Sequence, residues 1–339
     1  FQILKVKPTF EYKRDINLWV TNNLLQTVKE VLAKVEDKTC FLFCNSTDMI
    51  YALMKQLNIL DKSAVFCSDK SVDKLKGLKF KSANSTWNEN NMKHYNWLTS
   101  RFYNAVDIEI KECPNVLFLT DCYIAEYTMF DPNTDIIQCA GRFRNGITSL
   151  SLISNINKGF PIRNRDYLNG CIQCSKDIYD MIKCLYEQAR SNKIQQEVYK
   201  ATLDALPFTQ YITPDGRINY FAIDNYIDNE LVKGIYSSNE NLHLALFCND
   251  SFNVVSYQTN FYKLGDYERL RRENKSISLK EKRKIIVEQL ELLGDCETEM
   301  DFAFKEDLRK ADPLIVEAYE VLGKAKIEEL KYKKKLIRR

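Results

Sequence analysis

Short, uninterrupted apolar runs that alternate with amphipathic helix patterns constrain the fold of this chain more than any other feature. Thr39–Cys44 is one such run, and the polar residues that follow it are typical of a helix N-cap. The apolar spacing over Leu24–Val35 predicts a helix before it. Four further runs have the same character: Ser63–Cys67, Tyr95–Ser100, Asn115–Thr120 and Ser149–Ser154. A strand that is apolar on both faces must be covered on both faces, so the alternation predicts an α/β fold with a parallel sheet.

The pattern changes after about residue 165. Helical spacing predominates there, with one strand pattern over Asn253–Tyr262. The predicted helices are Ser175–Leu206, Ile223–Ile235, Ser278–Leu293, Met300–Lys310 and Pro313–Leu336. We therefore predict an α/β domain over residues 1–165 and a mainly helical accessory region over residues 166–339, either as one unit or as two subdomains.

Composition restricts the class of protein. Of the 339 residues, 45% are hydrophobic and 28% charged, and no apolar run reaches the roughly 20 residues that a membrane helix needs. The eleven cysteines are scattered, which is typical of free thiols in the reducing cytoplasm. The chain begins at Phe1 without a signal-peptide pattern, so we expect it to belong to a longer protein.

Polar side chains follow the predicted strands where each strand ends. They are Asn45, Ser46, Ser68, Thr99, Ser100 and Asp121. Because the carboxyl ends of parallel strands meet at one edge of a sheet, we expect these groups to lie together. Hydroxyl groups beside helix N-termini suit phosphate, and would grip a nucleic-acid backbone in a salt-dependent manner. The alternative for each is an ordinary helix N-cap.

Two arginines one residue apart mark a second candidate site. Arg142 and Arg144 follow Gln138 and Gly141 in a segment that we expect to start a helix. The planar guanidinium group suits the oxygens of a transferring phosphoryl group, and glycine allows close approach of the backbone. The alternative is a solvated basic turn. A further basic stretch, Arg269–Lys284, is either a nucleic-acid contact or a solvated helix face.

Four segments in order resemble motifs of the second RecA-like domain of superfamily-2 helicases and translocases. Phe41–Ser46 resembles motif IV, Ala64–Ser68 the strand after it, Leu98–Ile108 motif V, and Gln138–Arg144 motif VI. Two positions depart from the family pattern: Ala105 replaces a glycine, and Arg144 follows Gln138 by six residues instead of seven. The shortened motif VI is similar to that of herpesvirus-type origin-binding helicases.

The resemblance implies a role for each matching residue. Arg142 and Arg144 would be the catalytic arginine-finger candidates, and Asp107, Gln138 and Gly141 would lie at the ATP. The strand-end residues Asn45, Ser46, Ser68, Thr99 and Ser100 would bind nucleic acid, DNA in preference to RNA. For Asp107 the alternative is a surface carboxylate after a strand.

The sequence has no Gly-x-x-x-x-Gly-Lys-Ser/Thr and no acidic box after a strand. The resemblance therefore implies that ATP and Mg²⁺ bind mainly to an N-terminal RecA-like domain outside this chain, and that the chain alone does not hydrolyse ATP. One alternative is a non-catalytic nucleic-acid-binding or scaffold protein with a RecA-like fold. A Rossmann-type enzyme ranks below both, because no Gly-x-Gly-x-x-Gly follows a strand.

Overall fold

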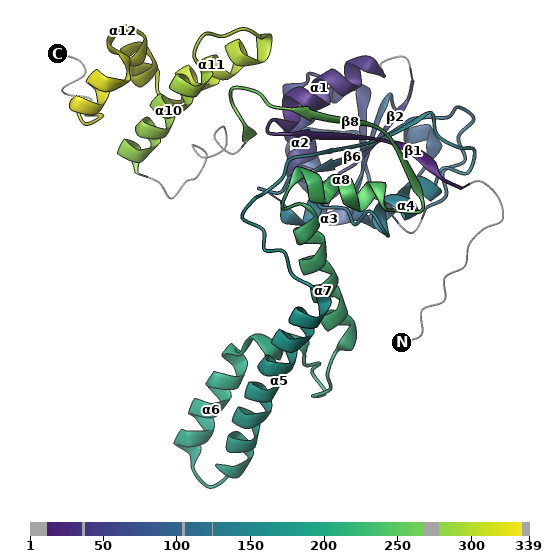
Figure 1. Ribbon diagram of the computed structural model, residues 1–339, viewed down its shortest axis with the longest axis vertical. Helices are drawn as coiled ribbons and strands as arrows, with labels where there is room; N and C mark the ends of the chain where they lie inside the picture. The colour runs from purple at the N-terminus through teal and green to yellow at the C-terminus, as the bar shows by residue number, and fades with distance from the viewer. Residues whose placement is uncertain (1–11, 36–37, 104–105, 124, 267–277, 334–339) are drawn as a thin grey trace. The chain divides into compact units, whose positions relative to one another are not determined.

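The computed structural model describes residues 12–35, 38–103, 106–123, 125–266 and 278–333. Its centre is a sheet of eight strands in the order β4-β3-β5-β2-β6-β7-β1-β8, in which every pair of neighbours is parallel (Figure 1). The strands are β1 (Arg14–Thr21), β2 (Cys40–Phe43), β3 (Ser63–Phe66), β4 (Ala83–Asn84), β5 (Tyr95–Leu98), β6 (Asn115–Thr120), β7 (Ser149–Ser154) and β8 (Phe252–Asn260). The prediction of an α/β fold with a parallel sheet is confirmed.

All five predicted apolar strands and the predicted strand near residue 253 are present. The sequence patterns missed β1 and β4. Strand β1 begins with Arg14 and Asp15 and carries Asn17, so it has no continuous apolar run. Strand β4 is only two residues long and pairs with the edge of β3.

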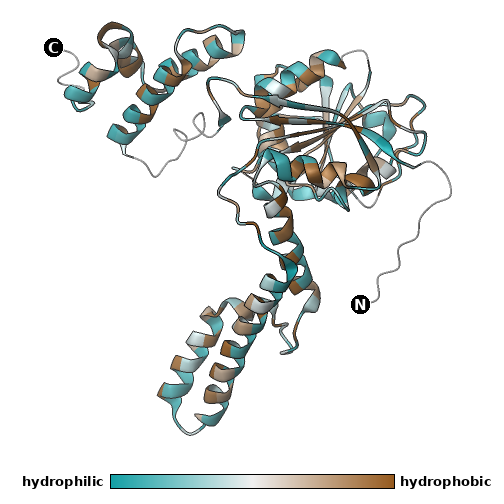
Figure 2. Ribbon diagram, in the orientation of Figure 1, coloured by the Kyte–Doolittle hydropathy of each residue, from teal (hydrophilic) through white to brown (hydrophobic). Residues whose placement is uncertain are grey.

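Helices α1 (Leu24–Lys34), α2 (Thr47–Gln56) and α3 (Asp69–Gly77) share one face of the sheet. Their buried apolar residues form a single cluster with alternate residues of the strands, including Leu42 and Trp97. The strands are brown and the solvent-facing sides of these helices largely teal in Figure 2. Three successive crossovers on one face follow from the right-handedness of parallel connections.

The opposite face of the sheet is packed with aromatic rings. Phe43 stacks on Phe118 with ring centroids 5.1 Å apart, and Phe41 meets Phe143 edge-on at 5.0 Å. The layer also includes Phe66, Trp87, Phe102, Tyr103 and Phe130. Aromatic pairs of this geometry contribute about 0.5–1.5 kcal/mol each beyond the area they bury. Helix α4 (Asp135–Gly141) buries Ile136, Cys139 and Ala140.

Burial determines the state of the strand cysteines. Cys40, Cys44 and Cys67 are free and buried, and burial raises the pKa of Cys44 to about 12 and that of Cys67 to about 11. These thiols are protonated and unreactive at neutral pH.

The chain forms two compact units. The first runs to Ile156 and resumes at His243, and the second is Asn157–Leu242. The predicted division placed all residues from 166 to 339 in the accessory region, whereas the residues from His243 onward belong to the unit that contains the sheet. Figure 1 shows the cause: the green strand β8 lies beside the purple strand β1, with which it pairs along its length.

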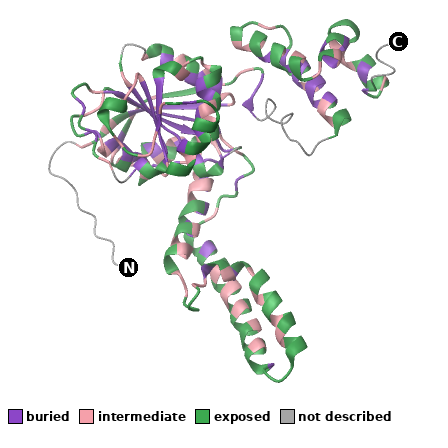
Figure 3. Cartoon of the chain, turned by 180° about the vertical axis from the view of Figure 1, so that it is seen from behind, coloured by how far each residue is buried: buried purple, intermediate pink, exposed green. Residues whose placement is uncertain are grey.

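The second unit is helical and has little core. It contains α5 (Arg165–Gln188), α6 (Lys193–Ala205) and α7 (Tyr220–Ile235), and it ends within α8 (Asn239–Phe247). The single helix predicted over Ser175–Leu206 is thus part of two helices. Leu168 is the one buried residue of α5, and α6 has none, so the two helices are mostly green and pink in Figure 3.

Three helices close the first unit. They are α10 (Leu279–Leu293), α11 (Glu299–Ala311) and α12 (Pro313–Glu329), and each was predicted, with α12 ending earlier than expected. They share an apolar cluster that includes Val287, Leu308 and Ile315. Arg283 and Asp312 form an ion pair of 2.7 Å that is about nine-tenths buried.

The segment after β8 is tied to the start of α1. Asp266 is buried, and its carboxylate accepts a hydrogen bond of 2.8 Å from the backbone N–H of Leu24. Asn22 and Asn23 donate to the carbonyls of Tyr262 and Leu264. A carboxylate at a helix N-terminus satisfies a free N–H group and interacts favourably with the helix dipole.

We expect Asp266→Ala to lower the free energy of unfolding by about 1–3 kcal/mol, because it removes the acceptor of a buried N–H group. The matched control is Asp73→Ala, an exposed aspartate of α3, which should change the free energy by no more than about 0.5 kcal/mol. Urea unfolding of both variants measures the difference. Equal midpoints would show that Asp266 does not stabilise the fold.

Candidate functional site

The structure brings the strand-end residues to one edge of the sheet. β3, β5 and β2 are successive neighbours, so Ser68, Ser100 and Asn45 follow adjacent strands. Asn45 links two of the loops, since its side-chain oxygen accepts from the Ser100 N–H at 3.2 Å and its amide donates to the Tyr127 carbonyl at 3.2 Å. The predicted clustering at this edge is therefore confirmed.

The hydroxyl groups at this edge differ in availability. Ser46 is buried and caps α2, where its Oγ accepts from the N–H of Met49. Thr99 is buried and donates to the Phe66 carbonyl at 3.4 Å. Ser68 caps α3 but stays partly exposed, and Ser100 is exposed. In this conformation an external ligand therefore meets Ser68, Ser100 and Asn45 before the other two.

Asp107 joins the two predicted arginines. Its carboxylate lies 2.6 Å from Nη2 of Arg144 and 3.8 Å from Nη1 of Arg142. The Arg142 side chain is 23% exposed and donates from Nε to the Tyr103 carbonyl at 3.0 Å. The Arg144 side chain is 50% exposed and, within the described residues, otherwise makes a 3.4 Å hydrogen bond to the Gly141 carbonyl. We define these three residues, Asp107, Arg142 and Arg144, as the arginine cluster.

Phe143 holds the arginine cluster in place. This residue is 2% exposed and packs on Phe41 and Phe43 in the aromatic layer. The backbone on either side of it pairs with Ile108: the Ile108 N–H donates to the Arg142 carbonyl at 2.9 Å, and the Arg144 N–H donates to the Ile108 carbonyl at 3.1 Å. An inward ring between two surface guanidinium groups explains the Arg-Phe-Arg pattern.

The arginines lie at the end of a helix, not at its start, so that prediction is wrong. Helix α4 ends at Gly141, and Arg142 is its C-cap. The helix begins at Asp135, three residues before Gln138, so all seven of its residues precede Arg142. The C-terminal end of a helix carries partial negative charge and favours arginine. Arg14 of β1 adds a third cation there, donating at 2.5 Å to the Ala140 carbonyl, and burial lowers the pKa of this guanidinium group.

The other two predicted ATP-site residues lie on α4. Gln138 is exposed. At Gly141 an added Cβ would meet no atom within 4 Å, so nothing in the described chain requires glycine there. The glycine leaves the end of α4 open for approach from outside. Ala105 and residues 269–277 of the basic stretch lie outside the described residues. In its described part, Arg283 is buried and paired with Asp312, so this arginine is not available to a nucleic acid.

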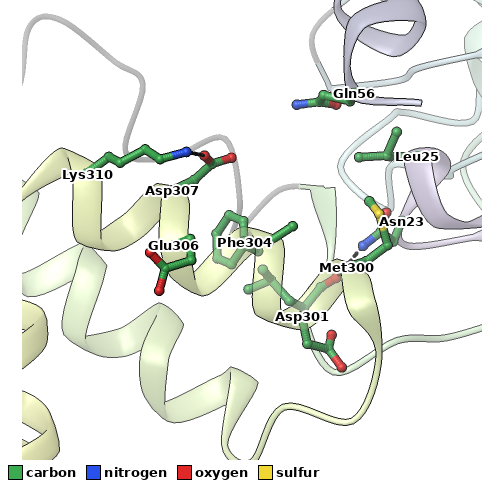
Figure 4. Close-up of a pocket in the computed structure, with 11 residues that line it drawn as sticks. Asn23, Leu25, Gln56, Met300, Asp301, Phe304, Glu306, Asp307 and Lys310 are labelled. Carbon is green, nitrogen blue, oxygen red and sulfur yellow. Dashed lines mark hydrogen bonds and ion pairs between the residues drawn. The ribbon is translucent and has the colours of Figure 1, made fainter. Parts of the chain in front are cut away.

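Two of the hollows on the described part of the first unit are relevant to the site. One, of about 440 Å³, borders Asp107 and continues along the sheet edge. The other, of about 300 Å³, lies between α11, the start of α1 and the end of α2, with Met300, Phe304 and Leu25 on its walls (Figure 4). It contains none of the predicted site residues. Among the described residues, no group of three or more His, Cys, Asp or Glu side chains is placed to hold a metal ion.

Comparison with known proteins gives no family. No protein-family model matches the chain, and no curated protein sequence matches it significantly. None of the helices in the described part of the chain combines the length and apolarity that crossing a bilayer requires.

Several residues that support the site were missed by sequence reasoning. Phe143 and Tyr103 lie inside the quoted motifs, but they support the site through a buried ring and a backbone carbonyl, which no motif reports. Arg14 is 126 residues away from its acceptor. The alternation of Arg142, Phe143 and Arg144 was the one available signal, because period-two alternation indicates one buried and two exposed side chains.

The two arginines should differ in their effect on stability. We expect Arg142→Ala to lower the free energy of unfolding by about 1–3 kcal/mol, because its charge-assisted hydrogen bond to Tyr103 is largely shielded from water. Arg144→Ala should change it by no more than about 0.5 kcal/mol, since exposed ion pairs contribute little. Thermal or urea unfolding distinguishes the two, and the reverse order would contradict the assigned roles.

Proposed function

We propose that this chain is the part of an ATP-dependent helicase or translocase that contributes the arginine finger and the nucleic-acid backbone contacts. The observation that carries the proposal is the arginine cluster, in which two guanidinium groups share one carboxylate at the surface. The arginine cluster carries a net positive charge. Because the Arg144 side chain is half exposed, its ion pair with Asp107 contributes little free energy, and Arg144 can exchange Asp107 for a more strongly charged anion. Such a group suits the charge that spreads over a transferring phosphoryl group.

The geometry favours different roles for the two arginines. Arg142 is anchored to the Tyr103 carbonyl and is the positioning residue, whereas Arg144 is the finger. Asp107 would hold Arg144 until the γ-phosphate of ATP arrives. In this proposal the sheet is a second RecA-like domain, and a first RecA-like domain holds ATP and Mg²⁺ through its own Walker residues. A location in the cytoplasm remains a prediction.

The strand-end edge is the proposed nucleic-acid surface. Ser68, Ser100 and Asn45 present a hydroxyl, a hydroxyl and an amide from three adjacent strands, and none of them reads a base sequence. Lys70, in the first turn of α3, and Arg101, after β5, are both exposed and follow Ser68 and Ser100 closely in the chain, which gives positive charge at this edge. We propose DNA as the partner, with opening and closing of the two RecA-like domains moving the edge along one strand.

Arg144→Ala should reduce DNA-stimulated ATP hydrolysis by about a thousandfold in the protein that contains both RecA-like domains, as expected for an arginine finger. Arg144→Lys should not restore the rate, because an ammonium group cannot reproduce the planar fork. Arg165→Ala, which breaks an exposed ion pair with Asp228, is the matched control and should leave the rate unchanged. If Arg142→Ala and Arg144→Ala both left hydrolysis unchanged, the motor assignment would fail.

Binding of the chain to a single-stranded oligonucleotide should weaken steeply with salt. A contact with three to five phosphates predicts a slope of roughly −2 to −4 in a plot of log affinity against log salt concentration. Fluorescence anisotropy of a labelled oligonucleotide measures it. An affinity that does not change with salt concentration would count against phosphate binding by the strand-end edge. If the chain binds the oligonucleotide but the arginine substitutions leave ATP hydrolysis unchanged, the non-catalytic scaffold alternative would be favoured.

A further inference from the structure

The 440 Å³ groove beside Asp107 has the composition of a base-binding site. It is lined by Ser85, Thr86, Trp87, Arg101, Phe102, Val106 and Asp107. Its residues come from the loops after β4 and β5, which flank β3 in the sheet. The groove therefore continues the strand-end edge outward, past Ser68. Its volume lies within the range of small-ligand sites, roughly 300–1,000 Å³.

Trp87 is a fixed and accessible aromatic surface. Its ring lies 4.8 Å from that of Phe66 and 5.8 Å from that of Phe41, so it is supported by the aromatic layer. It is nevertheless partly exposed and lines the groove. A rigid indole that is already ordered loses little conformational entropy when a flat ligand stacks on it.

Arg101 supplies a cation in the same groove. Its Nη1 lies 3.0 Å from Asp69, and its side chain is 45% exposed. Hydrogen bonding from Ser85 and then Arg101 lowers the pKa of Asp69, so this carboxylate stays ionised and links the loops after β3, β4 and β5. A guanidinium group has five N–H donors, and one edge of Arg101 can remain on Asp69 while another meets a phosphate.

We infer that this groove binds one base of a single-stranded nucleic acid, stacked on Trp87, with a neighbouring phosphate on Arg101. The inference rests on the proposed nucleic-acid function, and it adds a contact to the bases where the strand-end edge contacts only the backbone. Stacking of this kind accepts every base, so it strengthens binding and fixes the position of the strand without reading its sequence.

Intrinsic fluorescence tests this directly, because the chain has three tryptophans and the other two, Trp19 and Trp97, are buried. Addition of oligo(dT) to the whole chain should quench part of the emission. Trp87→Phe, which keeps a ring on Phe66, should remove the quenching, while the control Trp19→Phe should retain it. Trp87→Ala should weaken binding by about tenfold or more, as base stacking on aromatic side chains generally contributes.

An abasic oligonucleotide of equal length separates bases from phosphates. It should bind the chain more weakly, leave the tryptophan emission unchanged, and bind wild type and Trp87→Ala equally. Arg101→Gln should weaken binding of both oligonucleotides and reduce the salt slope. If labelled oligo(dT) binds by anisotropy but Trp87→Ala binds it equally well, the stacking site is overturned and the backbone-binding edge stands. If oligo(dT) does not bind the chain at low salt, both the stacking site and the backbone-binding edge are overturned.

Discussion

The insertion of Phe143 into the aromatic layer is the contact on which the arrangement of the arginines depends. The ring meets Phe41 and Phe43 of β2, a central strand, and the flanking backbone pairs with Ile108. These contacts bring Asp107, from the loop after β5, onto Arg142 and Arg144, from the loop after α4. Without the buried ring, two long charged side chains would have no common position, because exposed ion pairs alone are too weak to order a loop.

The same layer connects the arginine cluster to the sheet edge. Trp87 covers Phe66 and Phe41, and Phe43 and Phe130 lie against Tyr103, whose carbonyl holds Arg142. Close-packed interiors transmit displacement, so a shift at one end of such a layer is felt at the other. In the proposed function, a ligand on the strand ends and an anion at Arg144 would both bear on this layer, and coupling between them would require the layer to have two arrangements that both ligands bias.

Much of the fold followed from local patterns. The apolar runs at β2, β3, β5, β6 and β7 and most long helices were predicted within a few residues. The exceptions have physical causes. Strand β1 is interrupted by polar residues that other parts of the chain satisfy, as when Arg14 binds the end of α4. The pairing of β8 with β1 and the bond from Asp266 to Leu24 join residues more than 200 positions apart, which no local pattern reports.

The sequence by itself determined the strand-end chemistry, because period and capping are local properties and the carboxyl ends of parallel strands must meet at one edge. It also determined that two arginines follow a glycine. Only the tertiary structure decided that they end a helix, that Asp107 pairs with both, and that Ser46 and Thr99 are buried while Ser68 and Ser100 are not. Burial and long-range hydrogen bonding depend on which segments pack together, and packing is a property of the whole fold.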